Sequence, residues 1–91
     1  MTIYVISYDL NRPGQEYKEL HEAIKACGNW WHCLDSTWMV SSQMSGIDIA
    51  NKLWATMDRN DKLLVTPVAA GGSAWAGFTG DCESWLKNNL P

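Results

Sequence analysis

The spacing of apolar and polar residues predicts alternating strands and helices along the chain. β-Branched and aromatic residues fill positions 2–10, which predicts a strand that ends in the turn-forming run 11–14. Its apolar side chains fall on both faces, as in a central strand that is covered on each side. Between 16 and 27 apolar residues recur at helical spacing, and Gly28 then follows the predicted helix as a C-terminal stop.

Two short apolar runs, 29–34 and 37–41, come next. Residues 35–36 between them have turn chemistry, so the two runs are expected to form a tight hairpin. Ser45 is a suitable N-cap for a second amphipathic helix, which is expected to end at 58–61.

The remainder of the chain predicts one more strand and a short helix. Residues 62–69 form the strand, and Pro67 indicates that it lies at a sheet edge or finishes near that point. A Gly-rich connection at 71–73 then leads toward 81–89, whose acidic start and length suit a C-terminal helix.

The resulting order is strand, helix, strand, strand, helix, strand and a tail. This is the split β-α-β plan of an α+β domain, a ferredoxin-like β-α-β-β-α-β sandwich with a short C-terminal extension. Each of the first two helices lies in a crossover of the kind that joins parallel neighbouring strands. The chain thus divides into a ferredoxin-like domain, 1–70, and a connection with a C-terminal helix, 71–91, which packs on the domain or on the partner subunit.

The first three strands are apolar on both faces. In the first strand, one face carries Tyr4, Ile6 and Tyr8, and the other carries Ile3 and Val5. In the second strand, one face carries Trp30 and Leu34, and the other carries Trp31 and Cys33. Two helices can cover only one face of the sheet, and an exposed apolar face of this size would promote aggregation. A second copy of the chain is the simplest cover, so we expect a homodimer.

Composition limits the kinds of partner. The chain has 91 residues, 46% of them hydrophobic and 19% charged, which suits one small domain with a packed core. Its formal net charge is −3, with seven Lys and Arg in total. An acidic protein lacks the basic surface that grips a long nucleic-acid duplex. A short strand or a single nucleotide is the expected ligand instead.

The cysteines and the N-terminus bear on the cellular compartment. Cys27, Cys33 and Cys82 are too few for a disulfide framework and form no C-x-x-C pair, so we expect reduced thiols. The N-terminus has no basic region or cleavage site, and no apolar run reaches the roughly 20 residues of a membrane span. The expectation is a cytoplasmic protein without membrane contact. The spacing of Cys27, His32 and Cys33 disfavours a zinc site.

Several runs of residues carry a family resemblance. They are Tyr8-Asp9-Leu10, the following 11–14, the segment 30–38 with the sequence WWHCLDSTW, and the segment 61–65 with the sequence DKLLV. In these runs the chain resembles the small CRISPR-associated ferredoxin-fold protein of spacer acquisition. It resembles more closely the stand-alone SinR-like relatives of that protein, in a superfamily related to VapD. The resemblance covers residues 2 to about 69, and the tail 75–90 is similar to tails of the stand-alone relatives.

The resemblance implies a homodimer in which Asp9 of each subunit approaches the two-fold axis. Carboxylates placed there would share Mg²⁺, which prefers oxygen ligands, and position a water for attack on a phosphodiester. Asp9 is the one catalytic residue that carries over, and it is also the expected metal ligand. Related folds include metal-dependent nucleases, toxin-like ribonucleases and architectural dimers, so the resemblance leaves binding and catalysis both open.

The candidate residues also have purely structural interpretations. Asp9 would cap the following turn through an Asx-type hydrogen bond. Four aromatic residues have two interpretations: Tyr8, Trp30, Trp31 and Trp38. They form either a platform on which a base stacks or a part of the core and of the dimer interface.

Polar residues near the end of the first strand complete the candidate binding site. Arg12, with Asn11 beside it, is placed to contact a phosphate. His32 would act as a general base or hold a phosphate near neutral pH, unless it is simply a hydrogen-bonded strand residue. His21, among charged neighbours on the first helix, is expected to be solvated.

These expectations lead to three functions. The first is a homodimer that binds nucleic acid or a nucleotide near Asp9, with metal-dependent phosphodiesterase activity of an endonuclease or toxin-like kind if Asp9 holds Mg²⁺. The second is a non-catalytic module that sequesters a small nucleotide between subunits in antiviral defence or counter-defence. The third is a structural dimer without chemistry.

Overall fold

The computed structural model describes residues 1–11, 17–69 and 71–90, which form a four-stranded antiparallel sheet and three helices. The elements are β1 (Thr2–Asp9), α1 (Lys18–Lys25), β2 (Asn29–Leu34), β3 (Thr37–Ser42), α2 (Gly46–Trp54), β4 (Lys62–Pro67) and α3 (Gly80–Asn89). This order confirms the predicted α+β class. Within the described ranges, no helix has the length and hydropathy needed to cross a bilayer.

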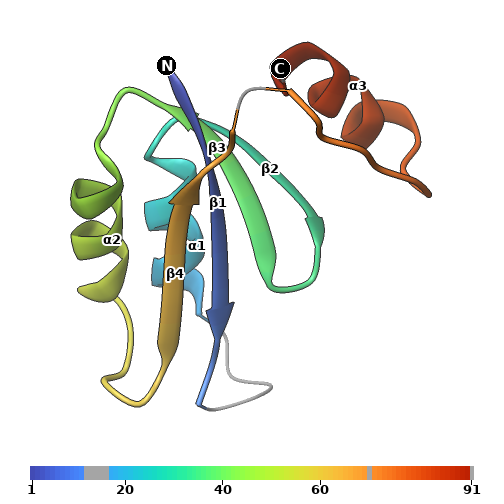
Figure 1. Cartoon of the computed structure of the whole chain (residues 1–91). Coiled ribbons are helices and arrows are strands. Elements are labelled where there is room, and N and C mark those ends of the chain that lie inside the picture. The colour runs from blue at the N-terminus through green and yellow to red at the C-terminus, as the bar shows by residue number, and fades with distance from the viewer. Residues whose placement is uncertain (12–16, 70, 91) are drawn as a thin grey trace.

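The sheet has the strand order β2-β3-β1-β4, with β1 and β3 at its centre (Figure 1). All three neighbouring pairs are antiparallel. The strands joined by helical crossovers, β1 with β2 and β3 with β4, are therefore parallel but not adjacent. The expectation that a crossover joins neighbouring strands is wrong, because β3 and β1 each insert between such a pair. This order is compatible with a ferredoxin-like arrangement.

The core lies between one face of the sheet and the helices α1 and α2, which Figure 1 shows on the same side. Helix α1 completely buries Leu20 and Ile24 of its predicted stripe, and α2 completely buries Ile49 and Leu53, whereas Ile47 and Trp54 of α2 are exposed. The strands contribute Tyr4, Ile6, Tyr8, Trp38 and Val40. Burial of such side chains is the main stabilising term of a domain this small.

Two predicted signals flank the helices α1 and α2. The backbone N–H of Asp48 donates to the Ser45 side chain at 3.2 Å, which confirms the predicted N-cap of α2. Gly28 follows α1 as predicted, but for a different reason. A Cβ atom at Gly28 would lie 2.1 Å from the carbonyl oxygen of Ser41, so glycine is required because β3 approaches this backbone closely.

The β2–β3 hairpin forms as predicted but contains a bulge. Trp31 pairs with Met39 and Leu34 pairs with Thr37, so two residues of β2 stand opposite Trp38. The extra residue reverses the alternation of side chains, and Leu34 therefore lines the same cavity as Trp31. The expectation that Leu34 shares a face with Trp30 is wrong for this reason.

The chain's own C-terminal segment covers part of the second face of the sheet. Trp31 is only 3% exposed, and its indole N–H donates to the carbonyl oxygen of Cys82 at 3.0 Å. Phe78 meets the Trp31 ring edge to face, with centroids 5.2 Å apart. Here the tail supplies the cover that we expected from a second subunit. A cavity of about 300 Å³ remains between this segment and the sheet.

The expectation of three reduced cysteines is wrong. Cys33 of β2 and Cys82 of α3 form a disulfide across 49 residues, whereas Cys27 is free and buried. Burial raises the pKa of the Cys27 thiol, which donates to the carbonyl oxygen of Ala23. No local spacing predicts the pair, because only the return of the C-terminal segment to β2 brings it together. The cysteine content therefore no longer argues for a reducing compartment.

Reduction of the disulfide should lower the free energy of unfolding by about 2 to 4 kcal/mol, since a link across a long loop restricts the unfolded chain. Urea unfolding with and without dithiothreitol measures this loss. The double variant Cys33→Ser, Cys82→Ser should have the free energy of unfolding of the reduced wild type, and dithiothreitol should not change it. In Cys27→Ala, dithiothreitol should lower the free energy of unfolding as much as in the wild type. Alkylation of all three cysteines in the native, unreduced protein would contradict the disulfide.

Candidate functional site

Trp38, at the centre of the hairpin, organises a cluster of polar aromatic side chains. It is 1% exposed, and its indole N–H donates to the hydroxyl of Tyr8 at 3.0 Å. The same hydroxyl lies 3.3 Å from Nε2 of His21. Because the indole can only donate, the Tyr8 oxygen accepts there, and the hydroxyl proton is available to His21. A neutral His21 that accepts this proton at Nε2 carries its own proton on Nδ1.

His32 stacks on Trp38, which lies opposite it across the hairpin. Their ring centroids are 3.7 Å apart, and the planes differ by 11°. Nε2 of His32 lies 3.1 Å from the backbone carbonyl oxygen of Asp35. A carbonyl oxygen only accepts, so Nε2 carries a proton and neutral His32 has its lone pair on Nδ1.

Trp30 extends this cluster to the surface. Its side chain is 41% exposed, and its ring centroid lies 5.5 Å from that of Trp38. The ammonium group of Lys25 stands 5.0 Å above the Trp30 ring, in a cation–π contact. We call Tyr8, His21, Trp30, His32 and Trp38 together the His-Trp cluster.

His21 is half-buried in the cluster rather than solvated as we expected. Its ring lies 5.4 Å from Trp38 and 5.8 Å from His32, between centroids. Burial, His32 and Lys25 lower the pKa of His21 from its ordinary value of 6.5, and Glu22 opposes them in part. The neutral form is therefore the stable one at neutral pH, consistent with a hydrogen bond from Tyr8.

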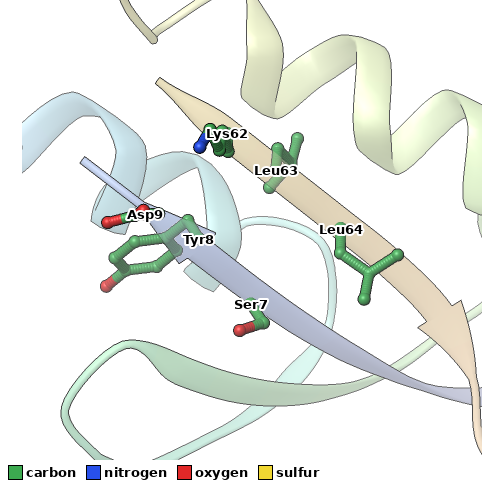
Figure 2. A pocket seen from close by; sticks show the side chains of 6 residues that line it. All are labelled: Ser7, Tyr8, Asp9, Lys62, Leu63 and Leu64. Atoms are coloured by element: carbon green, nitrogen blue, oxygen red, sulfur yellow. The ribbon is translucent and has the colours of Figure 1, made fainter. Parts of the chain in front are cut away.

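Asp9 lies away from the His-Trp cluster. Successive side chains of a strand point to opposite faces, so the exposed Asp9 faces away from the buried Tyr8. Its register partner is Lys62 of β4. Both residues line a shallow pocket of about 240 Å³, together with Ser7, Tyr8, Leu63 and Leu64. Figure 2 shows these six side chains on β1 and β4.

The segment after β1 is held by a buried carboxylate. Asp61, 4% exposed, accepts hydrogen bonds from the backbone N–H of Asn11 at 2.6 Å and of Asp58 at 2.8 Å. The Tyr17 hydroxyl donates to the same carboxylate at 3.3 Å. These contacts hold the C-terminal end of β1 beside the N-terminal end of β4. Asn11 is thus tied by its backbone, and Arg12 lies outside the described residues.

The structure brings together four of the candidate ligand residues and separates the others. Tyr8, Trp30, His32 and Trp38 belong to the His-Trp cluster, although Tyr8 and Trp38 are buried. Trp31 packs under the C-terminal segment on the opposite face. The stacking platform therefore reduces to one exposed indole, that of Trp30.

Sequence reasoning missed two residues of this site, His21 and Lys25. They are four positions apart, which places them on one side of α1, next to the buried stripe that begins with Leu20. That spacing was available in the sequence. The approach of α1 to β2 was not, and it is what brings His21 to His32.

No group of three or more His, Cys, Asp or Glu side chains within 1–11, 17–69 and 71–90 is arranged to hold a metal ion. Asp9 contributes a single carboxylate, so Mg²⁺ at this position would need further oxygen ligands from a second subunit, from a phosphate or from water.

The lowered pKa of His21 predicts how stability depends on pH. Below 6.5 the unfolded chain binds a proton at His21 more readily than the folded chain. The free energy of unfolding should therefore fall as pH drops from 6.5 to the lowered pKa, and level off below it. Urea unfolding of the wild type and of His21→Gln across this pH range measures this fall in the free energy of unfolding. The fall should be absent in His21→Gln. An unchanged pH dependence in His21→Gln would contradict the assignment, and Trp54→Ala on α2, outside the cluster, should keep the wild-type dependence.

A scan of the sequence against protein-family models gives no match. The resemblance to the CRISPR-associated ferredoxin-fold protein therefore stays a prediction that rests on the residues quoted for it. The His-Trp cluster and the Asp9 pocket hold the candidate functional residues.

Proposed function

We propose that this domain binds a nucleotide or a short single strand of nucleic acid at the His-Trp cluster. The observation that carries the proposal is the exposed indole of Trp30, with a lysine ammonium above it and two imidazoles in the same cluster. An aromatic ring suits a base, and a cation with imidazole N–H groups suits a phosphate.

Lys25 and Trp30 would exchange partners when the ligand binds. A base that stacks on Trp30 takes the place of the ammonium over the ring, and Lys25 then pairs with the phosphate. Each base–aromatic stack is worth about 1 to 3 kcal/mol. The net charge of −3 disfavours a long duplex, whose binding depends on many phosphate contacts.

We further propose that the chain is a ferredoxin-like homodimer. The part of the second sheet face near β1 and β4 is not covered by the C-terminal segment, and Leu64 on it is 58% exposed. A second copy would bury this area, and it would bring a second Asp9 carboxylate toward the first. The two Asp9 carboxylates would then bind Mg²⁺ together, and the metal would support phosphodiesterase activity.

A non-catalytic sequestering module is the second candidate. The acidic charge and the small size of the exposed aromatic area favour it, because both suit a single nucleotide better than a polymer. A sequestering module would release its bound nucleotide unchanged, whereas a phosphodiesterase would release a cleaved product.

Trp30→Ala should weaken binding by about 1 to 3 kcal/mol, because the base loses its stacking partner. Calorimetric titration with adenosine and guanosine monophosphates and with a short oligouridine measures the change. Lys25→Gln should weaken binding and reduce its dependence on salt. Trp54→Ala is the matched control, since Trp54 on α2 is 42% exposed. Equal losses in Trp30→Ala and Trp54→Ala would contradict a site at the His-Trp cluster.

Leu64→Lys should convert a dimer to a monomer in light scattering, because a charge would have to be buried at the interface. Ile47→Lys is the control, since Ile47 is 66% exposed on α2, away from the sheet face. A monomeric wild type would overturn the dimer. In the dimer, Mg²⁺-dependent cleavage that survives Asp9→Asn would rule out Asp9 as the metal ligand.

A further inference from the structure

Building on the nucleotide site proposed above, we infer that His21 and His32 form an acid–base pair that cleaves RNA without a metal ion. The two imidazoles come from α1 and β2, and their centroids are 5.8 Å apart with planes tilted by 56°. A phosphate that accepts a hydrogen bond from each of two imidazoles keeps the donor nitrogens about 5 to 8 Å apart. With centroids 5.8 Å apart, the two rings are close enough for one phosphodiester to contact both.

The hydrogen bonds give the two histidines different roles. Nε2 of His32 is held by the backbone carbonyl of Asp35, which leaves the Nδ1 lone pair as a general base. His21 faces the Tyr8 hydroxyl through Nε2. That hydroxyl can accept as well as donate, so it also suits protonated His21, whose Nδ1–H is then the general acid.

The reaction follows from these roles. Nδ1 of His32 takes the proton of the ribose 2′-hydroxyl, and the 2′-oxygen attacks the adjacent phosphorus. The bond between phosphorus and the 2′-oxygen forms while the bond to the 5′-oxygen of the next nucleotide breaks. His21 gives its Nδ1 proton to that 5′-oxygen. The products are a 2′,3′-cyclic phosphate and a free 5′-hydroxyl, and one proton has passed from His21 to the leaving group while His32 has gained one.

This mechanism identifies RNA as the substrate class. The nucleophile is the substrate's own 2′-hydroxyl, which DNA lacks. No step uses Asp9, which lies on the other face of the sheet. The same indole that would bind the base, Trp30, lies beside Trp38, on which His32 stacks. A base on Trp30 would thus place its own ribose phosphate near the imidazoles.

The surroundings of His21 set the pH range in which it acts as a general acid. The titratable groups that face it are Tyr8 from β1, His32 from β2, and Lys25 and Glu22 from α1. Burial, His32 and Lys25 lower its pKa, so the protonated form that donates is favoured at acidic pH. The cleavage rate should therefore decline toward alkaline pH, as the protonated fraction of His21 falls.

The test uses the whole protein, an end-labelled oligoribonucleotide, DNA of the same sequence and the 2′-O-methylated RNA, all in EDTA. The expected result is that only the unmodified RNA is cut, with 2′,3′-cyclic phosphate ends, while all three strands are bound. His21→Gln and His32→Gln should each lower the cleavage rate about 100-fold or more. Glutamine can keep a hydrogen bond to Tyr8 or to the Asp35 carbonyl, and circular dichroism checks the fold. Trp54→Ala should cleave as the wild type does.

The outcomes separate this inference from the proposed function. RNA that is bound but left intact in EDTA overturns the acid–base pair and leaves the binding function standing. A failure to bind any strand or nucleotide overturns both. Cleavage that needs Mg²⁺, is lost in Asp9→Asn and persists in both histidine variants assigns the chemistry to Asp9 and overturns the inference. Comparison of RNA with 2′-O-methylated RNA uses only the wild type, so the test does not depend on the folding of a variant.

Discussion

A buried indole needs an acceptor for its N–H, and Trp38 finds one in the Tyr8 hydroxyl at 3.0 Å. This bond fixes the end of β1 against the centre of the hairpin. The hydroxyl then meets His21 of α1, and the face of the indole supports His32. One side chain thus belongs to the core and positions both the Tyr8 hydroxyl and the His32 ring. Changes in packing at Trp38 and changes in the geometry of the histidines cannot be separated.

Periodic patterns predicted the elements well, because each depends on residues close in sequence. The stripe of α1, the Ser45 cap and the turn at 35–36 formed where expected, whereas α2 buries Ile49 and exposes Ile47 and Trp54. The features that were missed depend on distant partners. The Cys33–Cys82 disulfide needs the C-terminal segment to return, and Gly28 is required by the approach of Ser41. The neighbours of each strand likewise follow from the whole sheet.

The candidate site divides in the same way. Alternation along a strand separates Tyr8 from Asp9 and Trp30 from Trp31, and it could have been applied to the sequence alone. The meeting of His21 with His32 could not, since it requires the docking of α1 on β2. An acidic chain can still attract a phosphate in such a place, because the local field comes from a few nearby groups rather than from net charge. The two sheet faces therefore present different candidate residues, with the histidines and Trp30 on one and Asp9 on the other.

Alternation along β2 sends two adjacent residues to opposite faces of the sheet. His32 stacks on Trp38 on one face, and Cys33 is bonded to Cys82 of α3 on the other. The disulfide therefore attaches the C-terminal segment directly beside a residue of the candidate site. One short strand thus serves both as the anchor of the tail and as the support of an imidazole.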